Sequence, residues 1–307
     1  MGMGNISICV CTYKRPHLID GLMRALLSQS AVAQVGQVVI VDNDPAGSAA
    51  PALDRWKARS PVPLLALHCP EPNISLARNM AIHHATGEWL AFIDDDEVPV
   101  ADWLAHLLES AQTSGADAIF GPVLPSYPDN APPWIVQGGF FERRRLATGT
   151  AVGKTDVRSG NVLIRRGALL REPGPFDAAF GRTGGEDTLL FSRLLDKQAR
   201  FVWNDEAVVY EPVEENRMNA RWLLRRAYRG GQTFIRVTSL TAAGADKAVR
   251  LVVLLAKAVV QLGLALLLAA FSLPLGRAKA FQWLRVASAQ CGKITGAFGL
   301  RHQEYKH

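Results

Sequence analysis

The stretch 88-EWLAFIDDDEVPV-100 decides the fold. An apolar run typical of a buried strand ends in four consecutive acids, Asp94 to Glu97. Carboxylates this close repel one another and raise one another's pKa unless a positive charge lies among them. A strand that delivers acids to one place therefore predicts a cation site at its carboxyl end, although acids ahead of a helix near residue 101 could also serve as a helix cap.

Apolar runs rich in valine and isoleucine alternate with segments of helical periodicity on both sides of this stretch. The predicted strands are 6–13, 37–43, 64–69, 88–94 and 117–123, and the predicted helices are 17–29, 50–60, 75–85 and 101–112. This alternation predicts an α/β fold, a Rossmann-like and mostly parallel sheet with helices on both faces. Ligands bind beyond the carboxyl ends of such strands, so Thr12, Asp42 and Asp94 are expected at one edge.

Composition limits the class of protein. The chain has 307 residues, of which 49% are hydrophobic and 20% charged, which is typical of a globular protein with one large domain or a domain and an appendage. Its four cysteines follow neither a zinc spacing nor a disulfide framework, which favours a reduced, cytosolic setting. The N-terminus has the pattern of a strand, and we expect no signal peptide.

The charge is divided unevenly along the chain. Residues 1–215 hold 19 Lys and Arg against 26 Asp and Glu, a balance of −7, whereas residues 216–307 hold 15 against 2, a balance of +13. An acidic body with a basic tail indicates a polyanionic partner surface, either nucleic acid or an anionic membrane.

Residues 216–307 form the expected second region. Six arginines and no acid lie from Arg217 to Arg236, on a helix that we expect the glycine pair 230–231 to end. The run 258-AVVQLGLALLLAAFSLPLG-276 has nineteen residues without a charge, enough to cross a hydrocarbon core. It predicts a spanning or re-entrant helix at an anionic membrane, with a buried core helix as the alternative. A nucleic acid would not require this run, so no nucleic-acid partner is expected.

Four segments, in this order, resemble the family 2 glycosyltransferases, which have the GT-A fold. They are 11-CTYKRP-16, 39-VIVDND-44, 73-NISLARNMAIHHATGEWLAFIDDDE-97 and 184-GGEDTLLFSRLL-195. The resemblance covers roughly residues 5–215. The segment 209-VYEPVEENR-217 and the arginines after it resemble most the bacterial transferases of exopolysaccharide and lipid-linked oligosaccharide synthesis.

The resemblance implies two regions and a reaction. Residues 1–215 are the expected catalytic domain, with a nucleotide-sugar half over about 1–123 and an acceptor half over about 124–215. The expected reaction is an inverting transfer of a sugar from a nucleotide-sugar donor, UDP-linked in most of the family, to a lipid-linked or oligosaccharide acceptor. The expected location is the cytoplasmic face of the inner membrane, bound peripherally or by one C-terminal helix.

The family pattern assigns most of the candidate site residues. The nucleotide-sugar site is expected to comprise Thr12, Tyr13, Arg15, Asp42, Asn43, Arg78, Asp94, Asp95 and Asn161. Within it, Asp42 is expected to accept a hydrogen bond from the base, and Arg78 to lie against the base and phosphates.

The metal site is assigned by the same pattern. Asp96 is the expected ligand of Mn²⁺ or Mg²⁺, hard cations that share oxygen ligands with substrate phosphates. Many relatives have a histidine where this chain ends a strand in Glu211, so Glu211 is a second candidate ligand, with a salt-bridged surface acid as the alternative.

The second acid pair, Glu186 and Asp187, opens a predicted amphipathic helix. An inverting transferase needs a carboxylate that takes the proton of the attacking hydroxyl, and the family pattern assigns this role to Asp187. Glu186 is expected to contact the acceptor. The alternative is a pair of acids that caps the helix, and the two roles are compatible.

Two other classes of protein fit some of these features. A Mg²⁺-dependent nucleotidyltransferase of sugar phosphates would also use carboxylates on a parallel sheet, but it needs a glycine-rich phosphate loop, which the segment at Tyr13 lacks. A non-catalytic, membrane-bound glycan-binding protein would explain the basic tail and leave the acid pairs without a role.

Overall fold

A computed structural model describes residues 5–172, 174–241 and 246–300 of the chain. The chain divides into two compact units, and every site residue named above belongs to the first. Unit 1 comprises residues 1–124, 143–182 and 186–211, and unit 2 comprises residues 125–142, 183–185 and 212–307.

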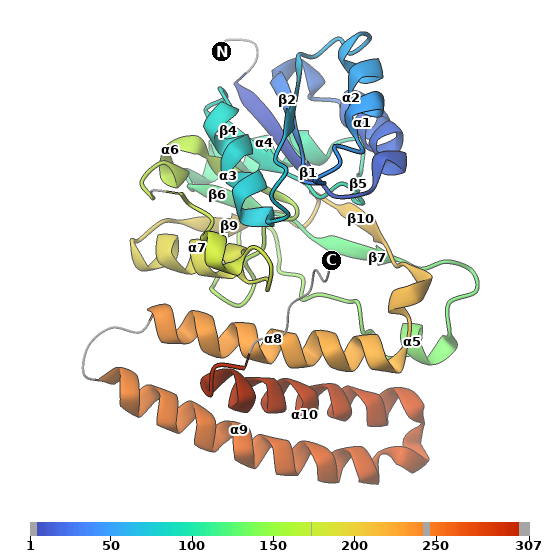
Figure 1. Cartoon of the computed structure of the whole chain (residues 1–307), viewed down its shortest axis with the longest axis vertical. Coiled ribbons are helices and arrows are strands. Elements are labelled where there is room, and N and C mark those ends of the chain that lie inside the picture. Colours follow the sequence, from blue (N-terminus) through green and yellow to red (C-terminus); the bar gives the residue numbers. More distant parts are fainter. Residues whose placement is uncertain (1–4, 173, 242–245, 301–307) are drawn as a thin grey trace. The chain divides into compact units, whose positions relative to one another are not determined.

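The core of unit 1 is a seven-stranded sheet with the order β3-β2-β1-β4-β8-β6-β9 (Figure 1). Its strands are β1 (Ile6–Thr12), β2 (Val35–Asp42), β3 (Leu64–His68), β4 (Trp89–Phe92), β6 (Ala118–Phe120), β8 (Val162–Arg165) and β9 (Phe201–Trp203). All pairs are parallel except those of β8, which is antiparallel to both β4 and β6. The predicted α/β fold with a mostly parallel sheet is confirmed.

Helices cover both faces of this sheet because the strand side chains alternate between two apolar clusters. Ile8 of β1 packs into one cluster with α1, α2 and α4, and its neighbour Cys9 packs into the other with α3, α6 and α7. These helices are α1 (Ile19–Leu27), α2 (Ala50–Lys57), α3 (Ile74–His84), α4 (Trp103–Ser114), α6 (Arg166–Leu169) and α7 (Glu186–Asp196).

The direction of β8 determines which loops meet at the edge that carries the site. The parallel strands β1, β2 and β4 end there, whereas the antiparallel β8 begins there. The segment 157–161, which precedes β8, therefore lies beside the acids that follow β4. A second sheet with the order β5-β10-β7 is formed by β5 (Val98–Pro99), β10 (Val209–Pro212) and β7 (Val123–Ser126).

Unit 2 is helical. Its elements are α5 (Pro133–Gln137), α8 (Ala220–Thr241), α9 (Asp246–Phe271) and α10 (Arg277–Ala297), with 3-10 turns at Glu215–Arg217 and Leu273–Leu275. Helix α10 packs against both α8 and α9 (Figure 1). The expectation that the glycine pair 230–231 ends a helix was wrong, because α8 continues through it to Thr241.

The reason for glycine inside α8 is its close approach to α10. A Cβ on Gly231 would lie 2.0 Å from the carbonyl oxygen of Ala289, and one on Gly292 would lie 1.9 Å from that of Tyr228. No real Cβ comes this close to a carbonyl oxygen, so the two backbones pack in a way that only glycine permits.

Within the described residues, one helical stretch, Ala248–Phe271 of α9, has the length and hydropathy of a membrane span. Only 11% of its most apolar window is buried within the protein. The alternative of a buried core helix is therefore not supported, since a core helix is covered by its neighbours.

Candidate active site

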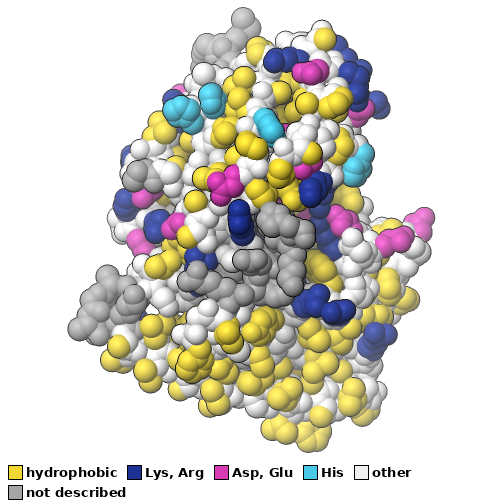
Figure 2. All heavy atoms as spheres, in the orientation of Figure 1, with side chains coloured by type: hydrophobic (Ala, Val, Ile, Leu, Met, Phe, Trp, Pro, Cys, Tyr) yellow, Lys and Arg dark blue, Asp and Glu magenta, His cyan; other side chains and the backbone are white. Residues whose placement is uncertain are grey.

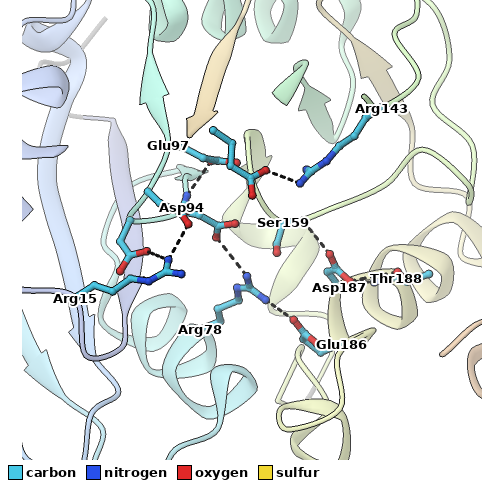
Figure 3. A network of polar contacts seen from close by, with 12 residues as sticks. Arg15, Arg78, Asp94, Glu97, Arg143, Ser159, Glu186, Asp187 and Thr188 are labelled. Carbon is cyan, nitrogen blue, oxygen red and sulfur yellow. Dashed lines mark hydrogen bonds and ion pairs between the residues drawn. The ribbon is translucent and has the colours of Figure 1, made fainter. Parts of the chain in front are cut away.

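The acids after β4 are partnered by arginines from distant segments (Figure 3). Arg15, just beyond β1, donates hydrogen bonds to Asp95 Oδ1 at 3.1 Å and to Asp96 Oδ2 at 2.7 Å. The hydroxyl of Thr12 donates to Asp95 Oδ2 at 2.7 Å. The positive charge that the acidic stretch requires thus comes in part from Arg15.

A second arginine, Arg78 of α3, joins the two acid pairs. Its Nη1 donates to Glu186 Oε1 at 2.5 Å, its Nη2 lies 3.5 Å from Asp94 Oδ1, and its guanidinium lies 5.4 Å from the centre of the Phe176 ring. Burial disfavours the charge of Arg78, but Glu186 and Asp94 outweigh that cost and raise its pKa. Arg78 was predicted from its LARN motif to contact the nucleotide, and the structure places it between the acids of both pairs.

Glu186 is buried at the start of α7, with 7% of its surface exposed. The pKa of Glu186 is raised to about 7, and burial is the largest cause. The charge of Arg78 lowers this pKa, and the charge of Asp187 raises it. Its second oxygen, Oε2, is buried and has no hydrogen-bond partner among the described residues. A free acceptor atom of this kind fits a substrate hydroxyl, because a buried oxygen without a donor is costly.

Asp187 is half-buried and held by its own helix end. Its Oδ1 accepts hydrogen bonds from the backbone N–H of Thr188 at 2.6 Å and from the Thr188 hydroxyl at 3.2 Å. Its Oδ2 accepts one from the backbone N–H of Ser159 at 3.3 Å. The carboxylate therefore has a fixed orientation toward the segment before β8 (Figure 3).

Glu97 belongs to the same network, and sequence reasoning gave it no role. Its carboxylate accepts a hydrogen bond from the backbone N–H of Asp94 at 2.9 Å, and it is 2% exposed. Burial and the charge of Asp94 raise its pKa well above the usual 4.5. A Cβ on Gly160 would lie 2.7 Å from Glu97 Oε1, so glycine is needed where this segment passes the acids.

Two further arginines were also missed. Arg143 donates to Glu211 Oε2 at 2.7 Å, which gives Glu211 a salt bridge, the alternative that its sequence position left open. Arg158 forms no hydrogen bond or ion pair with the described residues, and burial together with the nearby Arg143 lowers its pKa to about 10. No sequence motif includes either arginine. Their position in the segment that leads to β8 was the one feature that could have indicated their place near the acids.

Other predicted binding residues also stabilise the loops of the sheet edge. Asp42 accepts from the backbone N–H groups of Asp44 and Ala49, at 3.0 and 2.7 Å. Asn43 donates to the carbonyl oxygens of Cys69 and Glu71, at 2.9 and 2.6 Å. Tyr13 is half-buried directly after β1, at the same edge.

Asn161 is completely buried, with φ of 57°. Its amide donates to the carbonyl oxygens of Pro122 and Ala207, at 2.9 and 2.7 Å, and its Oδ1 accepts from the Trp103 indole at 2.7 Å. These described hydrogen bonds all hold the fold together. Its neighbour Gly160, rather than its own side chain, lies against the acids.

The donor set at this edge fits a hard divalent cation that is shared with a substrate. The predicted ligands Asp96 and Glu211 carry carboxylate oxygens, the ligand type that Mg²⁺ and Mn²⁺ prefer. Among the described residues no three acids, histidines or cysteines are grouped as a ready-made metal site. That is the expected arrangement where one or two carboxylates hold the ion and phosphate oxygens complete its ligands.

Acids at the carboxyl ends of parallel strands, and an acid pair opposite them, are the arrangement that the resemblance to glycosyltransferases of the GT-A type predicts. Residues 7–171 match Glycosyl transferase family 2, and the chain belongs to that family.

Two curated relatives are similar over most of the chain. The succinoglycan biosynthesis protein ExoM of Rhizobium meliloti is 38% identical over 248 residues, which are 80% of this chain and 78% of that protein. The glucosyl-dolichyl phosphate glucuronosyltransferase of Haloferax volcanii is 24% identical over 241 residues, 74% of this chain and 75% of that protein.

Two solved structures are similar in fold. The mannosyltransferase PcManGT of Pyrobaculum calidifontis, in complex with GDP-Man and Mn²⁺, has a TM-score of 0.63 with 17% identity, and covers 96% of this chain and 88% of its own. S. aureus TarS 1-349 in complex with UDP has a TM-score of 0.51 with 16% identity, and covers 96% and 92%. These similarities confirm the GT-A-like fold.

Proposed function

We propose that this protein is an inverting, metal-dependent glycosyltransferase that moves a sugar from a UDP-linked donor to a hydroxyl of a lipid-linked or polysaccharide acceptor. The observation that carries the proposal is the Arg78 bridge, which joins an acid of the donor side, Asp94, to an acid of the acceptor side, Glu186. Direct displacement requires the donor and the acceptor to lie within a few ångströms of each other. The Arg78 bridge holds the two acid pairs at such a short separation.

Asp187 is the proposed base. The backbone N–H of Ser159 and both donors of Thr188 orient its carboxylate and leave further lone pairs on each oxygen for the acceptor hydroxyl. It takes the proton of that hydroxyl as the oxygen attacks the anomeric carbon from the face opposite the leaving diphosphate. The buried Oε2 of Glu186 accepts a hydrogen bond from a second acceptor group and orients it.

The leaving nucleoside diphosphate is the negatively charged group that the proposed site must stabilise. Asp96, with Glu211, would hold Mn²⁺ or Mg²⁺, which supplies a Lewis acid for the departing charge. Arg15, which is paired with Asp95 and Asp96, contributes a cation beside the phosphates. Thr12, Tyr13, Asp42 and Asn43 line the proposed nucleotide side.

The relatives support the pathway and the acceptor class. One is named for succinoglycan biosynthesis and the other acts on a glucosyl-dolichyl phosphate, as its name states. We propose that this chain likewise builds a cell-surface glycan on a lipid-linked acceptor. Because such acceptors reside in a bilayer, the basic and apolar residues 216–307 are proposed to hold the protein at the cytoplasmic face of the inner membrane.

A donor panel tests the proposal. Purified protein is incubated with UDP- and GDP-linked sugars, Mn²⁺ and a lipid-linked oligosaccharide extract, and release of nucleoside diphosphate is measured. Release that depends on both acceptor and metal is expected, with an inverted anomeric configuration of the product by NMR. In a parallel incubation with a nucleoside triphosphate and a sugar 1-phosphate, release of pyrophosphate would instead assign a nucleotidyltransferase. Binding of glycan without any release would assign a non-catalytic protein.

A further inference from the structure

Helix α9 has two opposite apolar faces with different surroundings. On one face, Ala258, Ala265 and Ala269 are buried against the neighbouring helix α10. On the other, Val252, Val260, Leu267 and Phe271 have 60 to 77% of their surface exposed. A soluble surface helix has polar residues on its outer face, so this outer face requires an apolar environment that unit 2 does not itself supply.

A spanning orientation conflicts with the packing of α10. The two helices lie side by side (Figure 1), and α10 carries Lys279, Arg285 and Lys293. If α9 crossed the hydrocarbon core, the attached α10 would take these three cations into it, where isolated charges are strongly disfavoured. Lys257 would also lie near the middle of the span, since α9 runs from Asp246 to Phe271.

Two cations and one amide, all described, instead follow one edge of α9. Arg250, Lys257 and Gln261 recur at spacings of seven and four residues, and all three are exposed. At 3.6 residues per turn they form a polar line beside the apolar face. Beyond the end of α9, Arg277 and Lys279 are exposed as well. An apolar face flanked by cations is the pattern of a helix that lies in the interface of an anionic membrane.

We infer that α9 lies in the plane of a bilayer, with its exposed apolar face inserted into one leaflet and its cationic edge among anionic headgroups, and that it does not cross. The inference rests on the membrane attachment proposed above and states its geometry. In Figure 2 hydrophobic side chains cover most of the strip that α9 and α10 present in that view. Alanine contacts with α10 leave the larger side chains of α9 free for lipid.

Vesicle flotation tests the surface. The full-length protein is expected to float with vesicles that contain phosphatidylglycerol, and Val260→Arg or Leu267→Arg to reduce the floating fraction at least about tenfold, since arginine is costly among acyl chains. Leu170→Arg is the matched control, because Leu170 is an exposed apolar residue of unit 1, with 54% of its surface accessible. Its flotation should equal that of the wild type. Wild-type protein that ignores vesicles would overturn the membrane proposal, and a dimer disrupted by Val260→Arg would assign the face to a second copy of the chain.

Spin labels test the orientation. Cysteines at positions 252, 260 and 267, each in a background without the native cysteines, carry a nitroxide whose depth is read from collision with oxygen and with a water-soluble nickel complex. In-plane insertion predicts one shallow depth for all three labels. A depth that changes steadily from 252 to 267 would show a crossing helix and overturn the inference, while membrane attachment and the glycosyl transfer proposed above would both stand.

Discussion

The guanidinium of Arg78 contacts Glu186, 108 residues further along the chain, through a 2.5 Å hydrogen bond in the interior of unit 1. This pair joins helix α3 to the start of α7, where the proposed base Asp187 lies. Its energetics should therefore affect both stability and turnover.

The pair predicts a specific dependence of stability on pH. The pKa of Glu186 is raised from 4.5 to about 7, so the folded protein holds this proton more tightly than the unfolded chain. The contribution of Glu186 to the free energy of unfolding should fall as pH rises from about 4.5 to about 7 and stay constant above that. Glu186→Gln should remove this slope in urea denaturation series, while Asp196→Asn, at the exposed end of α7, should keep it. An unchanged slope in Glu186→Gln would show that the proton is bound elsewhere.

Removal of the Arg78 guanidinium should leave the charge of the buried Glu186 carboxylate unpaired. Arg78→Met leaves Glu186 buried without its partner, and breaking such a pair costs about 3–5 kcal/mol when the remaining group stays charged. The loss should be larger at pH 8 than at pH 5, where Glu186 is protonated, and Glu186→Gln in the same chain should restore part of it. Equal losses at both pH values in urea titrations would count against this coupling.

Asp187→Asn tests the base. The amide keeps an acceptor for the N–H of Thr188 but cannot take a proton, so turnover should fall by roughly 10²–10⁴-fold with donor affinity unchanged. Calorimetric titration of the donor and a turnover assay separate the two effects. Asp196→Asn makes the same substitution at the other end of the helix and should be neutral. A parallel loss of donor affinity would point to a structural role for Asp187.

Asp96→Asn tests the metal. The variant should lose metal-dependent transfer and the thermal shift that Mn²⁺ with nucleoside diphosphate gives the wild type, while its melting temperature without metal stays close to normal. Asp102→Asn is a suitable control, because Asp102 precedes α4 without a side-chain hydrogen bond to the helix. A full Mn²⁺-dependent thermal shift in Asp96→Asn would show that other residues bind the ion.

Asn161→Ala tests the proposed structural role of this residue. The substitution leaves the carbonyl oxygen of Ala207 and the Trp103 indole without their described partners, while Pro122 keeps the hydrogen bond from the backbone N–H of Val209. Each unsatisfied buried group costs about 1–3 kcal/mol, so we expect a loss of at least about 2 kcal/mol in the free energy of unfolding. Val98→Ala, at an exposed residue of the same unit, is the control. A stable variant with weak donor binding would favour the place in the nucleotide-sugar site that the family pattern assigns to Asn161.

The sheet edge was predictable because its signals are local. Each apolar run ends in its own polar residues, as in β2 before Asp42 and β4 before Asp94, and the parallel fold brings the run ends together. The antiparallel direction of β8 was not predictable from its short apolar run, because strand direction depends on the partners.

The arginines that form ion pairs with the acids could not be predicted from the local sequence in this way. Arg143 and Glu211 are 68 residues apart, and nothing in either segment marks the pairing. The glycine pair in α8 was misread for a similar reason. Glycine commonly ends a helix. Gly231 is instead required by the close approach of the α10 backbone, which depends on tertiary packing and not on the local sequence.

The contact between α8 and α10 has a consequence for how this protein varies through evolution. Positions 231 and 292 admit no side chain while the two backbones stay at their present separation. A Cβ on a third glycine, Gly296, would lie 2.8 Å from Ile235 Cγ2 and 3.0 Å from Gln232 Cα, less severe but still closer than ordinary contact. Homologues that retain the helix pair should therefore keep glycine at these three sites even where the neighbouring sequence has diverged beyond recognition. Loss of the three together should mark lineages whose C-terminal region is built differently.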